Sequence, residues 1–376
     1  MSSQDFVRSL PPYGGTGAQA RLRQIHLDPL LLVTLLAVVA LGLTILYSAV
    51  DRDPTLFGNQ VARMGMAFAA MVIAAQLHPR FYLRWTPVFY GGGLLLLIMV
   101  LAMGVSVKGS QRWLDLPGLP RFQPSEIMKL AVPMMVAWYF HDRPLPPRFR
   151  DVCAALLIIG LPAGCIMLQP DLGTGILVAG AGVAVVLLAG LPWKWVAMAG
   201  AGLAMAAPGL WFLLQDYQRQ RILTLFDPQS DPLGAGWNII QSTTAIGSGG
   251  VYGKGLFAGT QSHLDFLPES HTDFIIAVIA EELGLVGVLT MLALYLILLA
   301  RGLQIAAQAQ HTFERLVAGA LTLTFFVYVF VNVGMVSGLL PVVGVPLPLV
   351  SYGGTSAITL MASFGIIMAV RSHRGW

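Results

Sequence analysis

Long apolar stretches constrain the fold of this chain more than any other feature of its sequence. Residues 29–50 contain no charged side chain, and similar stretches recur as far as the C-terminus. A run of about 20 apolar residues is long enough for a helix to cross a lipid bilayer. Only 11% of the residues are charged, whereas about a quarter are charged in a typical soluble domain. The sequence therefore predicts an all-α integral membrane protein.

Stretches of this kind predict a bundle of about ten membrane-spanning helices, at residues 29–50, 60–77, 86–106, 125–141, 152–168, 172–191, 194–214, 274–300, 314–340 and 352–370. Lys and Arg concentrate in the short cytoplasmic loops of membrane proteins. One set of loops carries Arg80, Arg84, Arg143, Arg148, Arg150, Lys194, Arg301, Arg315, Arg371 and Arg374. The opposite short loops carry only Arg52, Lys108, Arg112 and Arg121. We therefore expect both chain termini to be cytoplasmic, which agrees with an even number of spans.

The predicted organisation is a single membrane domain, residues 29–376, behind a mobile cytoplasmic tail, residues 1–28. Two extracytoplasmic loops stand out, at about residues 107–124 and about 215–273, and the second precedes the eighth span. Loops of that length without a domain of their own are usually functional. Within the second loop, Ala235 to Thr244 predicts a short helix in the membrane interface. The net charge of +4 is scattered among short loops and does not indicate nucleic-acid binding.

A cluster of titratable residues stands where the long loop meets the eighth span, Glu269-Ser270-His271-Thr272-Asp273. Two interpretations fit it. Ser270-x-x-Asp273 has the spacing of a capping box, which satisfies the free amides of a helix start, and a carboxylate there suits the helix dipole. Alternatively, Asp273 is a catalytic carboxylate held at the membrane surface. Caps are far commoner than catalytic acids, so these five residues alone favour the capping interpretation.

Charged groups at membrane depth are costly and are therefore candidates for function. Glu126 and Lys129 are three residues apart at the start of the fourth span, so they share a helix face and can neutralise each other. They form either a structural ion pair or the polar wall of an outward-open cavity. Arg63 and the pair Glu281-Glu282 raise the same question, and we interpret the two adjacent glutamates as structural.

Cationic and aromatic residues gather in the predicted outer loops: Lys108, Arg112, Arg121, Arg219, Arg221 and Lys254, with Trp113, Trp237 and Tyr252. A solvated loop surface is one interpretation, and a site for a phosphorylated lipid is the other, because Arg and Lys bind phosphates. The stretch from Gly247 to Gly255 lacks Walker A spacing and predicts turns that permit close backbone approach. Prolines 341, 346 and 348 break the chain before Ser351, and broken backbone at membrane depth must be buried or line a cavity.

Six motifs follow one another along the chain: Lys108-Gly109-Ser110-Gln111-Arg112-Trp113, Phe122-Gln123-Pro124-Ser125-Glu126-x-x-Lys129, Gln169-Pro170-Asp171-Leu172-Gly173-Thr174, Phe266-Leu267-Pro268-Glu269-x-His271-Thr272-Asp273-Phe274, Ala280-Glu281-Glu282-Leu283-Gly284 and Pro346-Leu347-Pro348-Leu349-Val350-Ser351-Tyr352-Gly353-Gly354. In this order, on ten spans, they resemble the SEDS family (shape, elongation, division and sporulation). The resemblance runs from about residue 28 to the end of the chain. Residues 340–346 are more similar to RodA, the elongation branch, than to FtsW, the division branch.

The resemblance implies a peptidoglycan glycosyltransferase that polymerises lipid II into glycan strands during cell elongation, on the outer face of the bacterial cytoplasmic (inner) membrane. It implies a class B penicillin-binding protein with transpeptidase activity and the MreC/MreD elongation machinery as partners, besides the growing lipid-linked strand and membrane lipid. The family's essential aspartate falls on Asp273. The resemblance therefore favours the catalytic interpretation of this residue over the capping interpretation. The residues we predict to bind substrate are Arg112, Trp113, Glu126, Lys129, Lys254, Glu269, His271 and Ser351.

The implied reaction is an inverting displacement, which needs one base to take the proton of the acceptor 4-hydroxyl group, and Asp273 fills that role. Polyprenyl pyrophosphate is a good leaving group that needs cations, either Lys129, Arg112, Arg219, Arg221 and Lys254 or a divalent ion such as Mg²⁺ or Mn²⁺. The sequence leaves the metal requirement open. The alternatives are a transporter that flips lipid II across the bilayer, a scaffold that recruits wall enzymes, and a division-type polymerase.

Overall fold

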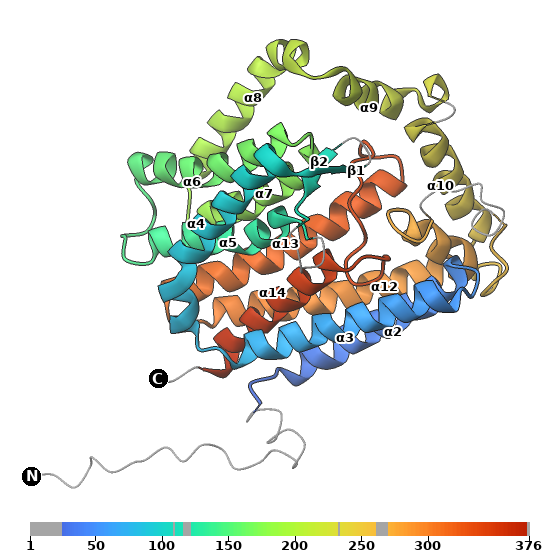
Figure 1. Ribbon diagram of the computed structural model, residues 1–376, viewed down its shortest axis with the longest axis horizontal. Coiled ribbons are helices and arrows are strands. Elements are labelled where there is room, and N and C mark those ends of the chain that lie inside the picture. The colour runs from blue at the N-terminus through green and yellow to red at the C-terminus, as the bar shows by residue number, and fades with distance from the viewer. Residues whose placement is uncertain (1–24, 108–109, 116–121, 232–233, 261–269, 374–376) are drawn as a thin grey trace, which may run out of the picture.

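Helices occupy all ten stretches that were predicted to span the membrane. The computed structural model describes residues 25–107, 110–115, 122–231, 234–260 and 270–373 (Figure 1). The ten helices are α2 (Pro29–Ala49), α3 (Pro54–Gln76), α4 (Pro79–Met103), α5 (Pro124–Phe140), α6 (Phe149–Leu168), α7 (Leu172–Leu188), α8 (Trp193–Leu213), α12 (Ile275–Ala307), α13 (Thr312–Val336) and α14 (Thr355–Ser372). The predicted helical bundle is therefore confirmed.

Seven of the described helices are long and apolar enough to cross a membrane: α2, α3, α4, α6, α12, α13 and α14. α7 is apolar but has only 17 residues, and α5 has the same length and carries Glu126 and Lys129. Many large apolar side chains of the bundle are exposed, as expected of a surface in contact with lipid chains. The structure supports a multi-pass membrane protein, and the number of ten spans stays a prediction.

Caps explain why two of the helices begin earlier than the apolar stretches that predicted them. α3 begins at Pro54 and α4 at Pro79. In both, the preceding side chain accepts a hydrogen bond from the amide two residues later, Asp53 at 2.8 Å and His78 at 3.1 Å. Proline suits the first helical position because it has no amide hydrogen to leave unsatisfied. Each helix therefore extends beyond its apolar part, which hydropathy alone does not reveal.

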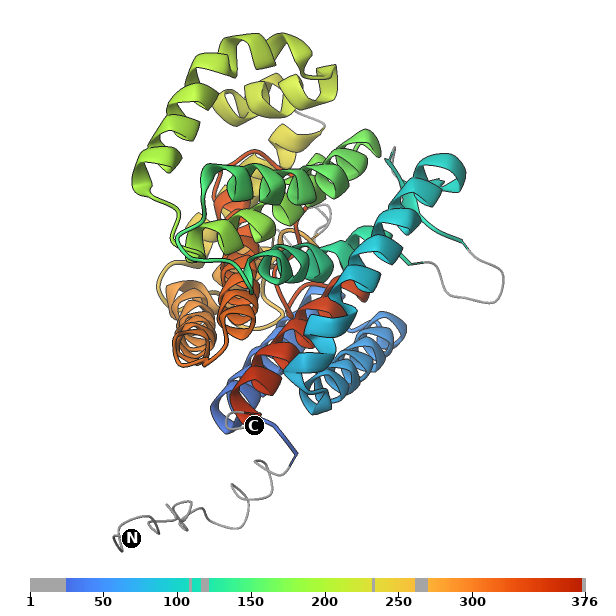
Figure 2. The same ribbon diagram turned by 90° about the vertical axis from the view of Figure 1, so that its left-hand side faces the viewer.

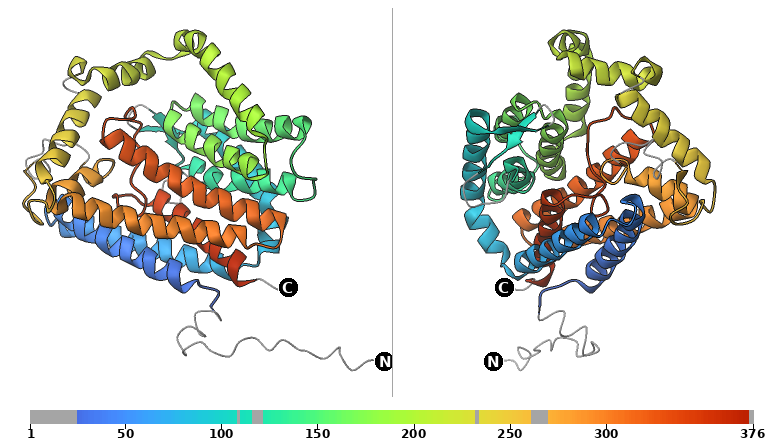
Figure 3. Two further views of the ribbon diagram at one scale, coloured as in Figure 1. Left: turned by 180° about the vertical axis from the view of Figure 1, so that it is seen from behind. Right: turned by 45° about the vertical axis from the view of Figure 1, so that its right-hand side comes forward.

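Helices that are distant in the sequence lie side by side in the bundle. α14 packs along α3, α2 packs along α12, and α13 contacts α5, α7 and α12; Figure 1 shows α2, α3, α12 and α14 together. α4, α5, α6 and α7 form a second group (Figure 2). α8 stands at the periphery with most of its described side chains exposed (Figure 3). The core lies along α13 and α14, which bury most of their residues.

The two long connections contain secondary structure of their own. The first holds an antiparallel hairpin of β1 (Val105–Val107) and β2 (Ser110–Trp113), which an all-α prediction omits. The second holds α9 (Asp216–Phe226), the 3-10 turn η1 (Pro228–Ser230) and α10 (Ala235–Gly249). The predicted helix in this connection is therefore confirmed. It packs against α12, and its location in the membrane interface stays a prediction.

α12 is broken at Gly284, whose φ of 67° and ψ of −162° are not helical. This backbone conformation suits glycine because no side chain is strained by it. The carbonyl oxygens of Glu281 and Glu282 accept hydrogen bonds from the amides of Lys254 and Gly255, each at 2.9 Å. Backbone groups that a helix break exposes in a membrane protein need such partners. A segment distant in the sequence therefore supplies hydrogen-bond donors for the carbonyl oxygens at the break.

That segment is the glycine-rich stretch, residues 247–255, which was expected to allow close backbone approach. A Cβ atom added at Gly249 would lie 1.9 Å from the carbonyl oxygen of Ala280, so a larger residue does not fit there. The expectation is confirmed, and the backbone that the stretch approaches is that of α12.

Glu281 and Glu282 both have partners that link segments of the bundle. The Glu281 carboxylate accepts from Lys254 Nζ at 2.7 Å, and Glu282 Oε1 accepts from the Ser48 hydroxyl of α2 at 2.5 Å. Both glutamates are fully buried. The contacts agree with the structural interpretation of this pair.

The described part of the predicted N-terminal tail, residues 25–28, packs against the helices. Residues 1–24 lie outside the described residues, so their mobility stays a prediction. The His26 ring stacks on the ring of His373 with centroids 4.3 Å apart, and His26 Nδ1 lies 3.2 Å from Gln76 Oε1. Burial lowers the pKa of His373, which favours its uncharged ring in the stack. His26 therefore contacts the helices, and the boundary of the tail at residue 28 stays a prediction.

Asp28 joins three helices at the end of the bundle where the chain enters α2. Its buried carboxylate accepts from the Leu31 amide at 3.0 Å and pairs with Arg301 of α12 at 3.1 Å and with Arg371 of α14. Removing one partner from a buried ion pair costs about 3–5 kcal/mol because the other charge is left unpaired. We expect Asp28→Ala to lower the free energy of unfolding by about that amount, measured as a fall in the thermal midpoint of the purified protein in detergent.

The matched control is Asp53→Ala, which removes a helix cap of α3 that makes no ion pair in the described structure. Loss of a cap alone costs about 0.5–2 kcal/mol. Equal, small shifts for both variants would show that the arginines contribute nothing through Asp28.

Candidate functional site

A cavity of about 670 Å³ opens among α3, β2, α5, α7, α13 and α14. The side chains that give it chemical character are Arg63, Arg112, Trp113, Glu126, Lys129, Tyr328 and Tyr352. Pockets of this size, with a few charged groups among apolar walls, are the usual form of a binding site for a small molecule or a substrate headgroup. The cavity therefore is the candidate site, and four residues predicted to bind substrate line it.

The ion pair of Glu126 and Lys129 forms one wall of the cavity. Lys129 Nζ lies 2.5 Å from Glu126 Oε1, and the two residues are 7% and 8% exposed. Lys129 Nζ also lies 5.1 Å from the centroid of the Tyr328 ring, a cation–π contact. The two residues pair with each other and also face the cavity, and the outward opening of this cavity stays a prediction.

The β-hairpin brings Arg112 and Trp113 to the cavity, and Asp171 holds the arginine there. Asp171 caps α7 by accepting from the Thr174 amide at 3.2 Å, and its other oxygen lies 3.3 Å from Arg112 Nη1. The same oxygen accepts from the side-chain amide nitrogen of Gln123, Nε2, at 3.2 Å. The first three sequence motifs therefore meet at one carboxylate.

Three buried polar atoms of the cavity wall have no hydrogen-bond partner among the described residues: Arg112 Nε, Glu126 Oε2 and Tyr328 Oη. Nearly all buried polar atoms in proteins are hydrogen-bonded, to protein or to bound water. Polar walls with spare hydrogen-bonding capacity are what a cavity for a polar ligand or water requires.

Asp273 lies in the turn directly before α12, at the edge of the cavity. The capping interpretation is not what the structure shows, because α12 begins at Ile275 and its N-cap is Phe274, without a side-chain capping bond. Asp273 Oδ2 would lie 3.4 Å from a Cβ atom added at Gly344, a residue that lines the cavity. The carboxylate therefore stands next to the cavity lining but is not itself part of it.

Three hydrogen bonds tie the Asp273 turn, directly or through Asn332, to the chain between α13 and α14. Asn332 Nδ2 donates to the carbonyl oxygen of Asp273 at 2.8 Å and to that of Val345 at 2.7 Å. The Tyr352 amide donates to the carbonyl oxygen of His271 at 2.8 Å. Since Val345 and Tyr352 line the cavity, the turn and the cavity wall are held together as one unit.

Of the remaining predicted substrate-binding residues, the three that the structure describes are not in the cavity lining. His271 contacts it indirectly, since its ring packs edge-on against Tyr352 at 5.9 Å. The Ser351 hydroxyl accepts from the Leu347 amide at 2.8 Å and is buried in its own loop. Lys254 pairs with Glu281 beside the break in α12. Glu269 lies outside the described residues.

Sequence reasoning missed three residues that organise the site. Tyr328 and Asn332 lie on α13, and Gln60 of α3 donates to the carbonyl oxygen of Ser351 at 3.3 Å and accepts from the Gly353 amide at 3.2 Å. Asn332 and Gln60 are fully buried. A signal existed, because a polar side chain inside an apolar span needs a partner.

An apolar groove of about 430 Å³ adjoins the cavity and lies between α3, α4, α5 and α14. Ile358 lines both hollows, and Ile127 lines the groove next to Glu126 in the cavity. The groove is lined almost entirely by apolar atoms. A molecule with a polar head and a long apolar chain fits this combination of hollows.

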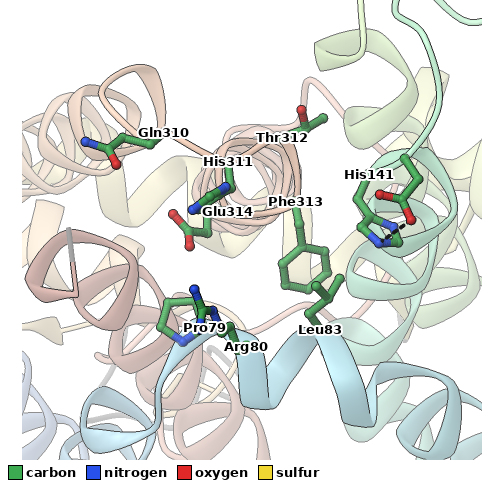
Figure 4. Close-up of a pocket in the computed structure, with 10 residues that line it drawn as sticks. Pro79, Arg80, Leu83, His141, Gln310, His311, Thr312, Phe313 and Glu314 are labelled. Atoms are coloured by element: carbon green, nitrogen blue, oxygen red, sulfur yellow. Dashed lines mark ion pairs between the residues drawn. The ribbon is translucent and has the colours of Figure 1, made fainter. Parts of the chain in front are cut away.

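A second polar pocket of about 340 Å³ lies at the opposite end of α5 and α13 from the cavity. Figure 4 shows that its side chains come from the start of α4, the end of α5 and the start of α13, with Arg80, His311 and Glu314 among them. His141 pairs with Asp142 at 2.9 Å on one side of it. The pocket lies far along the helices from Asp273, so it is separate from the candidate site.

Comparisons with known proteins agree with the sequence motifs. The family model of FtsW, RodA and SpoVE, described as cell cycle proteins, matches residues 24–375. Peptidoglycan glycosyltransferase MrdB of Escherichia coli K12 is 54% identical over 352 residues, which are 93% of this chain and 95% of that protein.

Two solved structures match the fold. One, on the coordination of polymerization and crosslinking by a peptidoglycan synthase complex, has a TM-score of 0.82 and 33% identity, covering 93% of this chain and 99% of that chain. The crystal structure of the rod shape determining protein RodA of Thermus thermophilus has a TM-score of 0.70 and 31% identity, covering 92% and 97% of the two chains. The chain therefore belongs to the FtsW, RodA and SpoVE family of cell cycle proteins, the SEDS family that its motifs predicted.

Proposed function

We propose that this protein is a peptidoglycan glycosyltransferase of the elongation type, which joins lipid II units into glycan strands, and that Asp273 is its general base. Peptidoglycan glycosyltransferase is the activity of the relative that is 54% identical. The observation that best supports the mechanism is the position of Asp273. Its carboxylate stands beside Gly344 at the edge of a cavity that carries cations and adjoins an apolar groove.

The shapes of the two hollows suit a lipid-linked sugar. The polar cavity is large enough for part of a sugar-pyrophosphate head, and the groove can hold the first segment of a polyprenyl chain. Burial of apolar surface in the groove would contribute about 25 cal/mol per Å² to binding. The head of the donor would then lie between Lys129 and the Asp273 turn.

In the proposed reaction the carboxylate of Asp273 takes the proton of the acceptor 4-hydroxyl group. The hydroxyl oxygen forms a bond to the anomeric carbon of the donor sugar as the bond from that carbon to the pyrophosphate oxygen breaks, with inversion. The electron pair of the broken bond leaves with the polyprenyl pyrophosphate. Cations at the cavity wall stabilise the charge that develops on this leaving group.

A gel assay for glycan strands tests the activity directly. Purified protein is incubated with lipid II and no other polymerase, and we expect strands to appear. A transporter that flips lipid II, or a scaffold without activity, gives no strands under these conditions. A lipid-flip assay in liposomes then separates those two alternatives.

The expected partners and location follow the same proposal. One solved structure similar to this chain belongs to a peptidoglycan synthase complex that couples polymerization to crosslinking. We propose a class B penicillin-binding protein with transpeptidase activity as the partner of this chain, with MreC and MreD in the same elongation machinery. The active site would face outward from the bacterial cytoplasmic membrane, with both termini inside. Labelling of single cysteines placed beside Asp273 in intact cells would test the orientation.

A divalent cation as cofactor stays a proposal. In the part of the chain that the structure describes, no three or more His, Cys, Asp or Glu side chains come together to hold a metal ion. Two of the carboxylates near the cavity have cationic partners, Lys129 for Glu126 and Arg112 for Asp171. Polymerisation measured with EDTA, and again after addition of Mg²⁺ or Mn²⁺, decides whether the reaction depends on one.

Asn332 is expected to position the base. Asn332→Leu keeps most of the side-chain volume but removes both hydrogen bonds, so the Asp273 turn is no longer fixed to Val345. A shift of about 1 Å in a catalytic group can cost about 100-fold in rate. We expect kcat to fall about 10- to 100-fold with a small change in KM. Thr324→Val is the control, since its buried hydroxyl bonds only within α13; equal effects of both variants would contradict a specific role for Asn332.

A further inference from the structure

The cations that line the cavity differ in whether a carboxylate already neutralises them. Among the described lining residues, Lys129 pairs with Glu126 at 2.5 Å and Arg112 pairs with Asp171 at 3.3 Å. Arg63 of α3 is the third cation, and within the described structure it has neither an ion pair nor a hydrogen bond. Its charge is therefore the one most available to an anionic ligand.

Contacts with its neighbours hold the Arg63 side chain in place without neutralising its charge. Its guanidinium carbon lies 4.7 Å from the centroid of the Tyr352 ring, a cation–π contact that leaves the N–H donors at the edge of the group. A Cβ atom added at Gly354 would lie 3.2 Å from Arg63 Cδ, so the side chain rests on the loop before α14. Arginine is suited to phosphates because its planar fork donates two parallel hydrogen bonds.

The face of α3 that carries Arg63 leads directly into the apolar groove. Met66 lines the cavity three residues later, and Ala70, Ile73 and Leu77 then line the groove at spacings that keep one face of a helix. Ten residues separate Arg63 from Ile73, about 15 Å along the helix. A polyprenyl chain lying in the groove would bring its terminal phosphates to the end of the groove where Arg63 stands.

Arg63 is also close to the proposed reaction centre. Tyr352, on which it stacks, donates its amide hydrogen to the carbonyl oxygen of His271, two residues before Asp273. The groove, Arg63 and Asp273 therefore lie in the same order as the lipid chain, the pyrophosphate and the sugar of the proposed substrate.

We propose that Arg63 binds the pyrophosphate of the polyprenyl-linked substrate and of the polyprenyl pyrophosphate that leaves. This deepens the proposed function, on which it rests, by assigning the head of the lipid to one residue. Lys129 and Arg112, whose charges are already paired, then add electrostatic stabilisation of the transition state from the cavity wall.

The test measures binding of polyprenyl pyrophosphate and of the corresponding uncharged polyprenyl alcohol to purified protein in detergent, by native mass spectrometry. Each variant is made in the Asp273→Asn background, so that turnover does not interfere. Loss of a charged hydrogen-bonding partner weakens binding about 10- to 100-fold. We expect Arg63→Gln to weaken pyrophosphate binding by this factor and to leave alcohol binding unchanged, and Arg63→Lys to recover part of the loss.

The control is Arg52→Gln, because Arg52 is exposed in the turn before α3 and stacks on Phe257 outside the cavity. It should bind both ligands as the unaltered protein does. Unchanged pyrophosphate binding by Arg63→Gln would overturn the inference, and so would an equal loss for both ligands, which indicates a structural role. Failure of the unaltered protein to polymerise lipid II would instead overturn the proposed function.

Discussion

Asp273→Asn is expected to abolish polymerisation of lipid II by the purified protein while leaving its folding and lipid binding intact. An amide has almost the same shape as a carboxylate but cannot accept the proton of the acceptor hydroxyl group. General-base catalysis contributes about 10²- to 10⁴-fold, and displacement by an unactivated sugar hydroxyl depends on it. Strand formation on a gel should therefore fall at least to the lower limit of detection, with the thermal midpoint unchanged.

The substitution preserves the contact that the main chain of Asp273 makes with Asn332. Asn332 binds the carbonyl oxygen of Asp273, and Asn at position 273 keeps that oxygen. Asp216→Asn is the control, since Asp216 is an exposed carboxylate of α9 in a loose pair with Arg219 at 3.7 Å. Retained polymerisation in Asp273→Asn would remove this residue from the role and direct attention to Glu269 and His271.

Much of the fold could be predicted because membrane-spanning helices can be recognised from their apolar composition. Predominantly apolar stretches located all ten helices, but their ends could not be placed, because caps such as Asp53 and His78 extend the helices into polar sequence. The β-hairpin was missed since three- and four-residue strands leave no periodicity to detect. The break at Gly284 was also hidden, because its stability comes from hydrogen bonds to residues about thirty positions away.

The site was predictable to the extent that its residues are unusual for a membrane span. Glu126 and Lys129 stand out within apolar sequence, and the structure places both at the cavity. Lys254 was grouped with them because it is a loop cation, yet its position depends on the fold of α12, which sequence reasoning did not supply. The motif resemblance directed attention to Asp273, whereas its local residues favoured a helix cap that the structure does not form.

Lys129→Met is expected to cause the second-largest loss, because it removes a cation from the cavity and leaves Glu126 buried without its partner. Breaking a buried ion pair costs about 3–5 kcal/mol, whereas an exposed pair contributes about 0–1 kcal/mol. Lys129 and Glu126 are nearly fully buried, so the larger figure applies. We expect the thermal midpoint to fall and polymerisation to decrease at least about 100-fold, the loss typical when one electrostatic contact to a transition state is removed.

Reversal of the pair distinguishes a structural ion pair from a cavity wall that acts on the substrate. Glu126→Lys combined with Lys129→Glu restores opposite charges three residues apart on the same helix face. If the pair only fixes packing, the double variant should recover both the thermal midpoint and polymerisation. We expect it to recover stability and to remain inactive, because the ammonium group then lies one helical turn away from its place beside Tyr328 and the cavity faces a carboxylate there. Recovery of polymerisation together with stability would contradict a direct role for Lys129.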